Sequence, residues 1–478
     1  TALNNKLTHN KLEHIIIVDN IINLKKRQTL MTPRHRLIIL LIFVAIFVLI
    51  TPALMMYLMG YRYNLPKRKI EQVGVLIADT LPKDTILRLN NAQLAKTRPA
   101  RLASLKPNYY LLLAEHEGYY GWQKNIEIKS RETTIFYDIA LFKQSSPTIL
   151  QSDNIEIFDL SPKEDYVAYF KENNLWINNL ETGTSAPFYQ SAFRMPPERK
   201  IKWSPDNKLI LLEEKKDGAE RAVIIDSTKK ENLINLGSFI GPRLTNLAWS
   251  DNSDRLYGTF DNKLYAVNIK SRSFEKLAQD VDSFAVIGST VFLTKKTSKE
   301  TIVYKYQLLN IFSDSLSKLA SLPPAHYQIL TQKNNFLALS NTEENLIYLA
   351  DLSDSTQPLL RLNGKSAVWG NGPKNNYLYY YDDSELSIFD PNTKQTSLLL
   401  RYSNNIRRVL PMPQIPYFII QTDKNIQIGE LDDRDQRQII TAFEGKEIFL
   451  TALDKKGKTV YFTDKLRKGN SLFKLDIQ

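Results

Sequence analysis

The side chains that most often perform chemistry are sparse in this chain of 478 residues. There is no cysteine, which excludes disulfides, thiolate zinc sites and a cysteine nucleophile. Of the five histidines, only His116 and His326 lie beyond the first 36 residues, and they are far apart in sequence. A histidine-based metal site or catalytic triad is therefore not expected. We predict no catalytic residue, no cofactor and no metal, and hence no enzyme.

Two acidic clusters come closest to a metal site. Asp432-Asp433-Arg434-Asp435 offers carboxylates, but it lacks the glycine and the distal glutamate of a calcium loop and contains an arginine. A solvated hairpin tip is the preferred interpretation. Asp382-Asp383-Ser384-Glu385 is interpreted in the same way, as a turn between two strands.

An aromatic group could stack on sugar rings. It comprises Tyr109, Tyr110, Tyr119, Tyr120 and Trp122. Alternation along strands would place about half of these rings in a core. We therefore prefer a core role, with a glycan site as the alternative.

A long apolar segment near the N-terminal end indicates the cellular compartment of the rest of the chain. Leu37 to Gly60 contains no charged residue and would extend about 36 Å as a helix, enough to cross a membrane. Flanking charges are nearly balanced, but a charged start followed by one apolar run is typical of an export signal. We predict a transmembrane signal-anchor helix at 37–60 of a single-pass cell-membrane protein, with tail 1–36 cytoplasmic and the rest extracytoplasmic.

The N-terminal tail is irregular in composition. A start at Met31 would give a short charged lead directly before the apolar segment, and residues 1–30 would then be an over-extended reading frame. If they are translated, we expect a short cytoplasmic tail.

The net charge of +12 is concentrated near the predicted membrane span. Residues 144–478 are nearly neutral, so a nucleic-acid partner is not expected. Cations beside a bilayer are attracted to anionic head groups. The candidates for such a contact are Arg62, Lys67, Arg68, Lys69, Arg98 and Arg101.

A small strand-rich unit is predicted at 73–143, after a linker at 65–72. Its expected strands are Val73 to Ala78, Thr85 to Leu89, Leu111 to Ala114 and Trp122 to Ile128, separated by turns such as Asn90-Asn91.

The unit resembles the PEGA domain, a small β-sandwich-like module of bacterial envelope proteins. The resemblance rests on Gly74-Val75-Leu76-Ile77, Pro82, Ile86, Leu89, Thr97-Arg98-Pro99, Leu105, Pro107, Tyr110, Gly118-Tyr119, Trp122 and Ile126. Asp84-Thr85, Asn90-Asn91 and Asn108 depart from the family pattern. Because asparagine tolerates left-handed backbone, we expect Asn90-Asn91 and Asn108 to preserve the geometry that glycine provides in the family.

Residues 144–478 repeat with a period of about 40. Eight short strands follow one another, centred on Trp176, Ile224, Tyr265, Tyr304, Ile347, Ile388, Gln427 and Phe473, and an apolar strand precedes each of them. An all-strand repeat of this length is typical of a β-propeller blade. We prefer eight blades, with seven as the alternative. The predicted fold is mainly β: one transmembrane helix, a PEGA-like β-sandwich and a β-propeller.

A turn motif recurs in the first three units. It reads Leu160-Ser161-Pro162, Trp203-Ser204-Pro205-Asp206-Asn207 and Trp249-Ser250-Asp251-Asn252. It resembles the turn of the periplasmic Tol-system propeller repeats. We expect the tryptophan to wedge between neighbouring blades while the polar residues shape the turn.

The eighth unit is predicted to take its outer strand from elsewhere. It stops at Gln478 directly after its third strand, which would leave an open sheet edge. The segment Thr148 to Leu150 has strand composition, and we predict that it pairs beside Leu472 to Leu475 and closes the ring.

Three classes of function fit these features, because propellers host many functions. The preferred one is a membrane-anchored extracytoplasmic binding or scaffolding protein of the cell envelope, with a protein or envelope-polysaccharide partner. The first alternative is a transmembrane sensor or assembly subunit. The second is a glycan-active hydrolase or lyase that uses carboxylates in the propeller channel, although the sequence shows no regular set of such residues.

Overall fold

The computed structural model describes residues 33–64, 68–94, 97–193, 197–239, 241–307, 316–341, 343–353, 359–371, 376–467 and 469–478. The chain divides into two compact units. The first comprises 1–77, 101–109 and 127–135, and the second comprises 78–100, 110–126 and 136–478. The predicted tail at 1–30 lies outside the described residues. The predicted domain boundaries, 73–143 and 144–478, stay a prediction.

The N-terminal helix α2 is Pro33–Leu58. Its segment Arg34–Leu58 is long and apolar enough to cross a membrane, and none of its most apolar window is buried by the described chain. Arg62 closes its C-terminal end, because the Nη1 atom donates to the Tyr57 carbonyl at 2.6 Å and the guanidinium lies 3.6 Å from the Tyr57 ring centre. Unpaired carbonyls at a helix C-terminus favour such a cation.

A β-hairpin follows the helix, where the sequence predicts a linker. Strands β1 (Tyr61–Asn64) and β2 (Lys69–Gln72) pair antiparallel, with Tyr61 opposite Gln72. The linker prediction is therefore wrong for 69–72, and residues 65–67 lie outside the described part. The alternating pattern of the short segment was too brief to identify a strand from sequence.

The next seven strands form two sheets. They are β3 (Gly74–Leu81), β4 (Ile86–Leu89), β5 (Ala92–Gln93), β6 (Ala100–Leu105), β7 (Asn108–Glu115), β8 (Trp122–Ile128) and β9 (Thr133–Ala140). One sheet has the order β6-β3-β9 and the other β5-β4-β7-β8. The four predicted strands are confirmed in position. Asn90 has the expected left-handed backbone at φ 50°, but the expectation for Asn108 is wrong, since it opens the extended strand β7.

Eight further sheets follow, each with four strands. The first four blades are made of β11 (Ile155–Leu160), β12 (Tyr166–Lys171), β13 (Asn174–Asn179), β14 (Ser185–Gln190); β15 (Glu198–Trp203), β16 (Leu209–Lys216), β17 (Ala219–Asp226), β18 (Leu233–Asn235); β19 (Thr245–Trp249), β20 (Arg255–Phe260), β21 (Lys263–Asn268), β22 (Ser273–Ala278); β23 (Ser283–Ile287), β24 (Thr290–Lys296), β25 (Thr301–Gln307), β26 (Ser317–Leu322). The 3₁₀ turn η1 (Leu236–Ser238) follows β18.

The other four blades repeat this order. They are made of β27 (Tyr327–Lys333), β28 (Phe336–Asn341), β29 (Leu346–Asp351), β30 (Leu360–Asn363); β31 (Ser366–Asn371), β32 (Asn376–Tyr381), β33 (Glu385–Asp390), β34 (Gln395–Arg401); β35 (Ile406–Pro411), β36 (Tyr417–Thr422), β37 (Asn425–Glu430), β38 (Ile439–Glu444); β39 (Ile448–Leu453), β40 (Thr459–Leu466), β41 (Gly469–Asp476), β10 (Thr148–Gln151). All eight predicted strand centres lie in the third strand of a blade. The preference for eight blades is confirmed.

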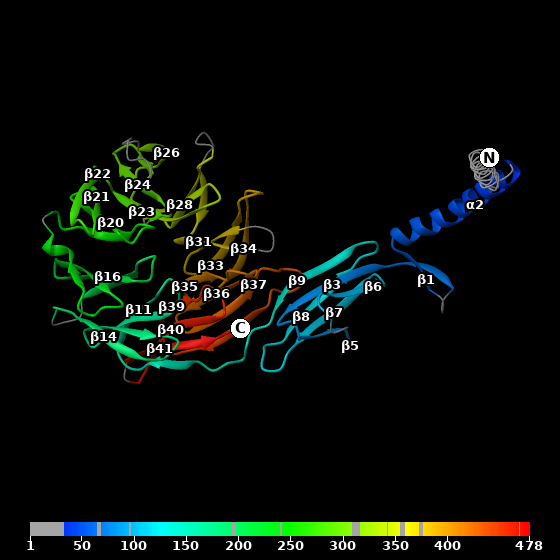
Figure 1. The fold of residues 1–478 in the computed structure, drawn as a ribbon, viewed down its shortest axis with the longest axis horizontal. Coiled ribbons are helices and arrows are strands. Elements are labelled where there is room, and N and C mark those ends of the chain that lie inside the picture. Colours follow the sequence, from blue (N-terminus) through cyan, green and yellow to red (C-terminus); the bar gives the residue numbers. More distant parts are fainter. Residues whose placement is uncertain are drawn as a thin grey trace, which may run out of the picture. The chain divides into compact units, whose positions relative to one another are not determined.

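Apolar contacts between consecutive blades hold the ring together. The second strand of each blade is largely buried, and β28 and β36 are buried along their whole length, because neighbouring sheets cover both faces. Seven apolar clusters each join one blade to the next, and an eighth joins Tyr461 and Leu472 of the last blade to Tyr169 of the first. The ring of sheets is thus closed, and Figure 1 shows the sheets following one another around it.

Strand β10 completes the eighth blade, as predicted. Thr148 lies opposite Lys474 and Ile149 opposite Phe473 in an antiparallel pair, with a register shift before Gln151. The backbone N–H of Lys143 also donates to the Ile477 carbonyl at 2.9 Å. The chain before the first blade therefore pairs with the last strand, which removes an exposed sheet edge.

Candidate ligand-binding cavity

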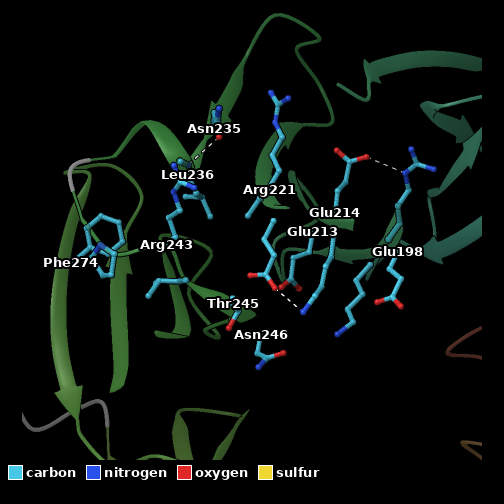
Figure 2. Close-up of a pocket in the computed structure, with 18 residues that line it drawn as sticks. Glu198, Glu213, Glu214, Arg221, Asn235, Leu236, Arg243, Thr245, Asn246 and Phe274 are labelled. Atoms are coloured by element: carbon cyan, nitrogen blue, oxygen red, sulfur yellow. Dashed lines mark hydrogen bonds and ion pairs between the residues drawn. The ribbon is translucent and has the colours of Figure 1, made fainter. Parts of the chain in front are cut away.

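A cavity of about 860 Å³ lies between the second and third blades. The ends of β15, β16 and β17 line one side, and η1 with the chain before β19 lines the other (Figure 2). Its walls combine charged, amide and apolar side chains: Glu198, Arg199, Lys200, Glu213, Glu214, Lys215, Glu220, Arg221, Asn235, Leu236, Pro242, Arg243, Leu244, Thr245, Asn246 and Phe274. Its volume lies within the range of small-molecule pockets, roughly 300 to 1,000 Å³.

Arg199 and Glu214 form a buried ion pair at the wall of the cavity. Their side chains are 2% and 0% exposed, and Arg199 Nε lies 3.1 Å from Glu214 Oε1. Arg199 also contacts Glu156 and Asn173, and its guanidinium lies 4.1 Å from the ring centre of Phe170. Buried charges need partners of this kind, so Arg199 and Glu214 are structural groups that fix the wall.

The other wall carboxylates are also engaged. Glu213 Oε1 lies 3.3 Å from Lys202 Nζ, and its Oε2 accepts the Leu247 N–H at 3.1 Å. Glu220 Oε1 lies 2.9 Å from Lys215 Nζ. The cavity therefore presents few free acids, and its remaining charged groups are mainly cationic.

The propeller also holds one acid with a strongly altered pKa. Burial raises the pKa of Asp159, in β11, to about 6, and hydrogen bonds from the backbone of Trp203 and Leu160 oppose the shift, as does the charge of Arg408. The groups that shift it include no second carboxylate.

The predicted turn motif serves the ring as expected. Trp203 Nε1 donates to the Asp159 carbonyl at 3.2 Å, and Trp249 Nε1 donates to the Lys202 carbonyl at 3.1 Å. Each tryptophan therefore links its own blade to the preceding one. The turns also contact each other, because the Lys163 N–H donates to Asn207 Oδ1 at 3.1 Å.

A fourth copy of this turn escaped the sequence analysis. In the eighth blade Asp454 takes the place of Ser204: its N–H donates to the carbonyl five residues later, and Oδ1 accepts the Thr459 N–H at 2.9 Å. The Ser204 hydroxyl accepts the Leu209 N–H in the same way at 2.8 Å. Because a carboxylate can replace a hydroxyl as acceptor, the sequence Asp454-Lys455-Lys456-Gly457 could have revealed the turn.

The two histidines beyond the N-terminal tail lie in separate ion pairs. His116 Nε2 lies 3.2 Å from Asp84 Oδ2, and His326 Nδ1 lies 2.6 Å from Asp282 Oδ1. A hydrogen bond to the Glu117 carbonyl, followed by that to Asp84, raises the pKa of His116. No group of three or more metal-binding side chains occurs among the described residues.

The interpretation of Asp432-Asp433-Arg434-Asp435 as a solvated tip is partly wrong. The segment does join β37 to β38, and its last three residues are exposed. However, the carbonyls of Asp432 and Arg434 accept hydrogen bonds from the buried Lys124 Nζ, at 2.8 and 2.9 Å. This contact joins residues some 300 positions apart, which sequence spacing cannot reveal. The turn interpretation of Asp382-Asp383-Ser384-Glu385 is confirmed by its position between β32 and β33.

Two members of the aromatic group are used in contacts with the seventh blade. Trp122 is 3% exposed and donates through Nε1 to Glu430 Oε2 at 2.9 Å. The Tyr120 hydroxyl donates to the Thr441 carbonyl at 3.3 Å. Tyr109, by contrast, is 68% exposed. A core role is thus confirmed for Trp122.

The candidates for a membrane contact are only partly free. Arg62 is held at the end of α2, and Arg98 donates through Nε to Thr80 Oγ1 at 3.2 Å and also contacts the Thr85 carbonyl. Lys67 lies outside the described residues. Arg68, Lys69 and Arg101 are exposed.

Comparisons with known proteins identify the fold class. The chain is similar to a structure described as the Dos1 propeller, with 12% identity and a TM-score of 0.51, over 70% of this chain and 95% of that one. It is similar to the dihydro-heme d1 dehydrogenase NirN in complex with DHE, with 12% identity and a TM-score of 0.51, over 67% of this chain and 75% of that one. No family model matches the chain, and no curated protein does. The protein thus contains a β-propeller, and these likenesses extend to the fold alone.

Proposed function

We propose that this chain is a membrane-anchored, extracytoplasmic scaffolding protein of the cell envelope whose propeller is an interaction platform. The observation that carries the proposal is the combination of an uncovered apolar helix at the N-terminal end with a closed ring of eight sheets. A helix of this length and composition is stable in a bilayer, where its backbone polar groups are paired internally.

The ring is suited to binding rather than to catalysis. Its blades are fixed by apolar clusters and by tryptophan hydrogen bonds, so its loops are presented on a rigid frame. The described residues contain no cluster of metal-binding side chains, and Asp159 has no second acid among the groups that shift its pKa. These features favour a binding protein over the glycan-active enzyme.

The strands between 73 and 143 support an envelope location through their resemblance to the PEGA domain. The alternating burial of β8 fits a half-buried strand of such a module. The exposed residues Arg68, Lys69 and Arg101 would add a contact with anionic lipid. Exposed ionic contacts weaken with salt, so this contact should be lost at high ionic strength.

Protease accessibility tests the proposal. Cells that express the full chain with a C-terminal epitope tag are converted to spheroplasts and treated with protease. We expect the tag to be removed without lysis, because residues 61–478 lie outside the cytoplasmic membrane. A chain that starts at Met31 is the matched control and should give the same result. Protection of the tag until detergent is added would show that the orientation is wrong.

Fractionation tests the anchor itself. Replacing Phe43 and Phe47 of α2 with lysine places two charges in the middle of the apolar segment, at about 3 kcal/mol each. We expect this variant to leave the membrane fraction. Replacing the same residues with leucine should leave the chain in the membrane, and release of both variants would contradict an anchor role.

A further inference from the structure

We propose that the cavity between the second and third blades binds an acidic side chain of a protein partner, and that Arg221 is its principal contact. This inference rests on the proposed function as an interaction platform and names the chemistry of one partner site. It follows from the charges that remain unpaired at the cavity.

The cationic groups of the cavity outnumber the acids available to them. Glu213, Glu214 and Glu220 are each held by a neighbouring cation. No described carboxylate pairs with Lys200, Arg221 or Arg243, and Glu198 is the remaining acid. In Figure 2 no interaction line joins the Arg221 guanidinium to another of the residues drawn. The site therefore favours an anion.

Arg221 is the group that most requires a partner. Its Nε atom is buried and has no hydrogen-bond partner in the described chain. Its guanidinium lies 5.9 Å from the ring centre of Tyr189, and this contact supplies no hydrogen-bond acceptor in the plane of the Nε–H. Unsatisfied buried donors are costly and rare in folded proteins. A carboxylate would accept two hydrogen bonds from the guanidinium at once.

The rest of the lining favours a peptide over a free ion. Leu236, Pro242, Leu244 and Phe274 provide apolar surface, and Asn246 adds an amide that can bond to a peptide backbone. The volume of about 860 Å³ exceeds what one carboxylate group needs. An acidic residue with an apolar neighbour in an extended segment matches both the charge and the apolar wall.

Fluorescence anisotropy on the full chain in detergent tests this site. The probe is a labelled pentapeptide of alternating glutamate and leucine, and the comparison probe has glutamine in place of glutamate. We expect the glutamate probe to bind at least about ten times more tightly, which corresponds to about 1.4 kcal/mol. Arg221→Gln should weaken binding at least tenfold, and higher salt should weaken it further. Lys230→Gln, an exposed change in the turn between β17 and β18, should leave it unchanged.

Each other outcome contradicts the inference. Equal binding of both probes, or equal binding by wild type and Arg221→Gln, would exclude a carboxylate contact. Competition by free acetate as effective as the peptide would exclude peptide recognition. If Arg221→Gln fails to fold, the exposed Arg243→Gln replaces it, and unchanged binding would again count against the site. The peptide-binding assay and the protease test on spheroplasts are independent. A negative result in the binding assay would not change the conclusion about orientation, and a negative result in the protease test would not change the conclusion about the cavity.

Discussion

Lys124 Nζ lies 2.7 Å from Glu430 Oε1, and the two side chains are 0% and 3% exposed. The remaining Lys124 donors bind the carbonyls of Asp432 and Arg434. Glu430 is satisfied as well, since Oε1 also accepts the Gln438 N–H at 2.8 Å and Oε2 accepts the indole of Trp122. The pair thus fixes part of β8 to the hairpin of the seventh blade through a complete buried network.

Removing one member of this pair should be strongly destabilising. In Lys124→Met the carboxylate of Glu430 stays buried without its cation, so we expect a loss of about 3 to 5 kcal/mol in the free energy of unfolding. The double variant with Glu430→Met should recover part of it. Urea denaturation monitored by tryptophan fluorescence measures the change. The control Lys129→Met breaks an exposed pair with Glu127 and should cost less than about 0.5 kcal/mol.

Closure of the ring can be tested by replacing Thr148–Gln151 with Gly-Ser-Gly-Ser. This change removes the side chains and β propensity of β10 and should cost about 1 kcal/mol for each backbone hydrogen bond to β41 that is lost. Hydrogen exchange should then accelerate in β41 and β40. The same replacement in the exposed turn at 228–231 is the control and should leave exchange in β41 unchanged. Unchanged protection in both variants would show that β10 does not stabilise the eighth blade.

Two tryptophans allow the stabilising effect of an indole hydrogen bond between blades to be distinguished from the effect of packing. Trp203 Nε1 donates to the Asp159 carbonyl, whereas the buried Nε1 of Trp369 has no partner in the described chain. The change to phenylalanine removes the same atoms at both positions, and Trp203 is buried whereas Trp369 is half-buried. We expect Trp203→Phe to be more destabilising than Trp369→Phe by about 1 kcal/mol, measured by chemical denaturation. Equal losses would mean that the indole hydrogen bond adds no net stability.

Asp159 should make the stability depend on pH. Its pKa is about 6 in the folded protein and 3.8 as its ordinary value, so between these values the folded state binds more protons than the unfolded state. The contribution of Asp159 is therefore most favourable below pH 4 and declines as the pH rises to about 6. Asp159→Asn should remove this decline and stabilise the protein at pH 7 by about 3 kcal/mol.

Thermal unfolding of wild type and Asp159→Asn at pH 4 to 8 measures this effect. The difference between the two proteins should grow from pH 4 to pH 6 and then stay constant. A difference that does not vary with pH would contradict the raised pKa. His116→Gln is a suitable control, because it removes a different titrating group, which pairs with Asp84 and not with Asp159. It should leave the pH dependence that Asp159 causes unchanged.

Much of the propeller could be predicted from local patterns. Each second strand contains a short apolar run, such as Phe336 to Leu339 in β28, because both faces of a blade are covered by neighbours. Each third strand recurs at about 40 residues, so the number of blades and the role of β10 followed from counting strands. Sequence spacing was less informative for β2, because a segment of four residues carries little periodicity. The expectation for Asn108 came from the family resemblance, and the extended strand β7 replaced it.

The sequence by itself determined the apolar helix, the repeat and the turn chemistry, because these depend on residues within a few positions of one another. Tertiary structure decided which charges are paired. Lysine is usually a surface residue, so the sequence gives no sign that Lys124 is buried. Its burial is possible because Glu430, far away in the sequence, lies beside it and pairs with its charge. The same holds for the cavity at Arg221, whose walls come from six separate segments that meet only when two sheets stack. Charge pairing depends on distance in space, which no local pattern in the sequence records.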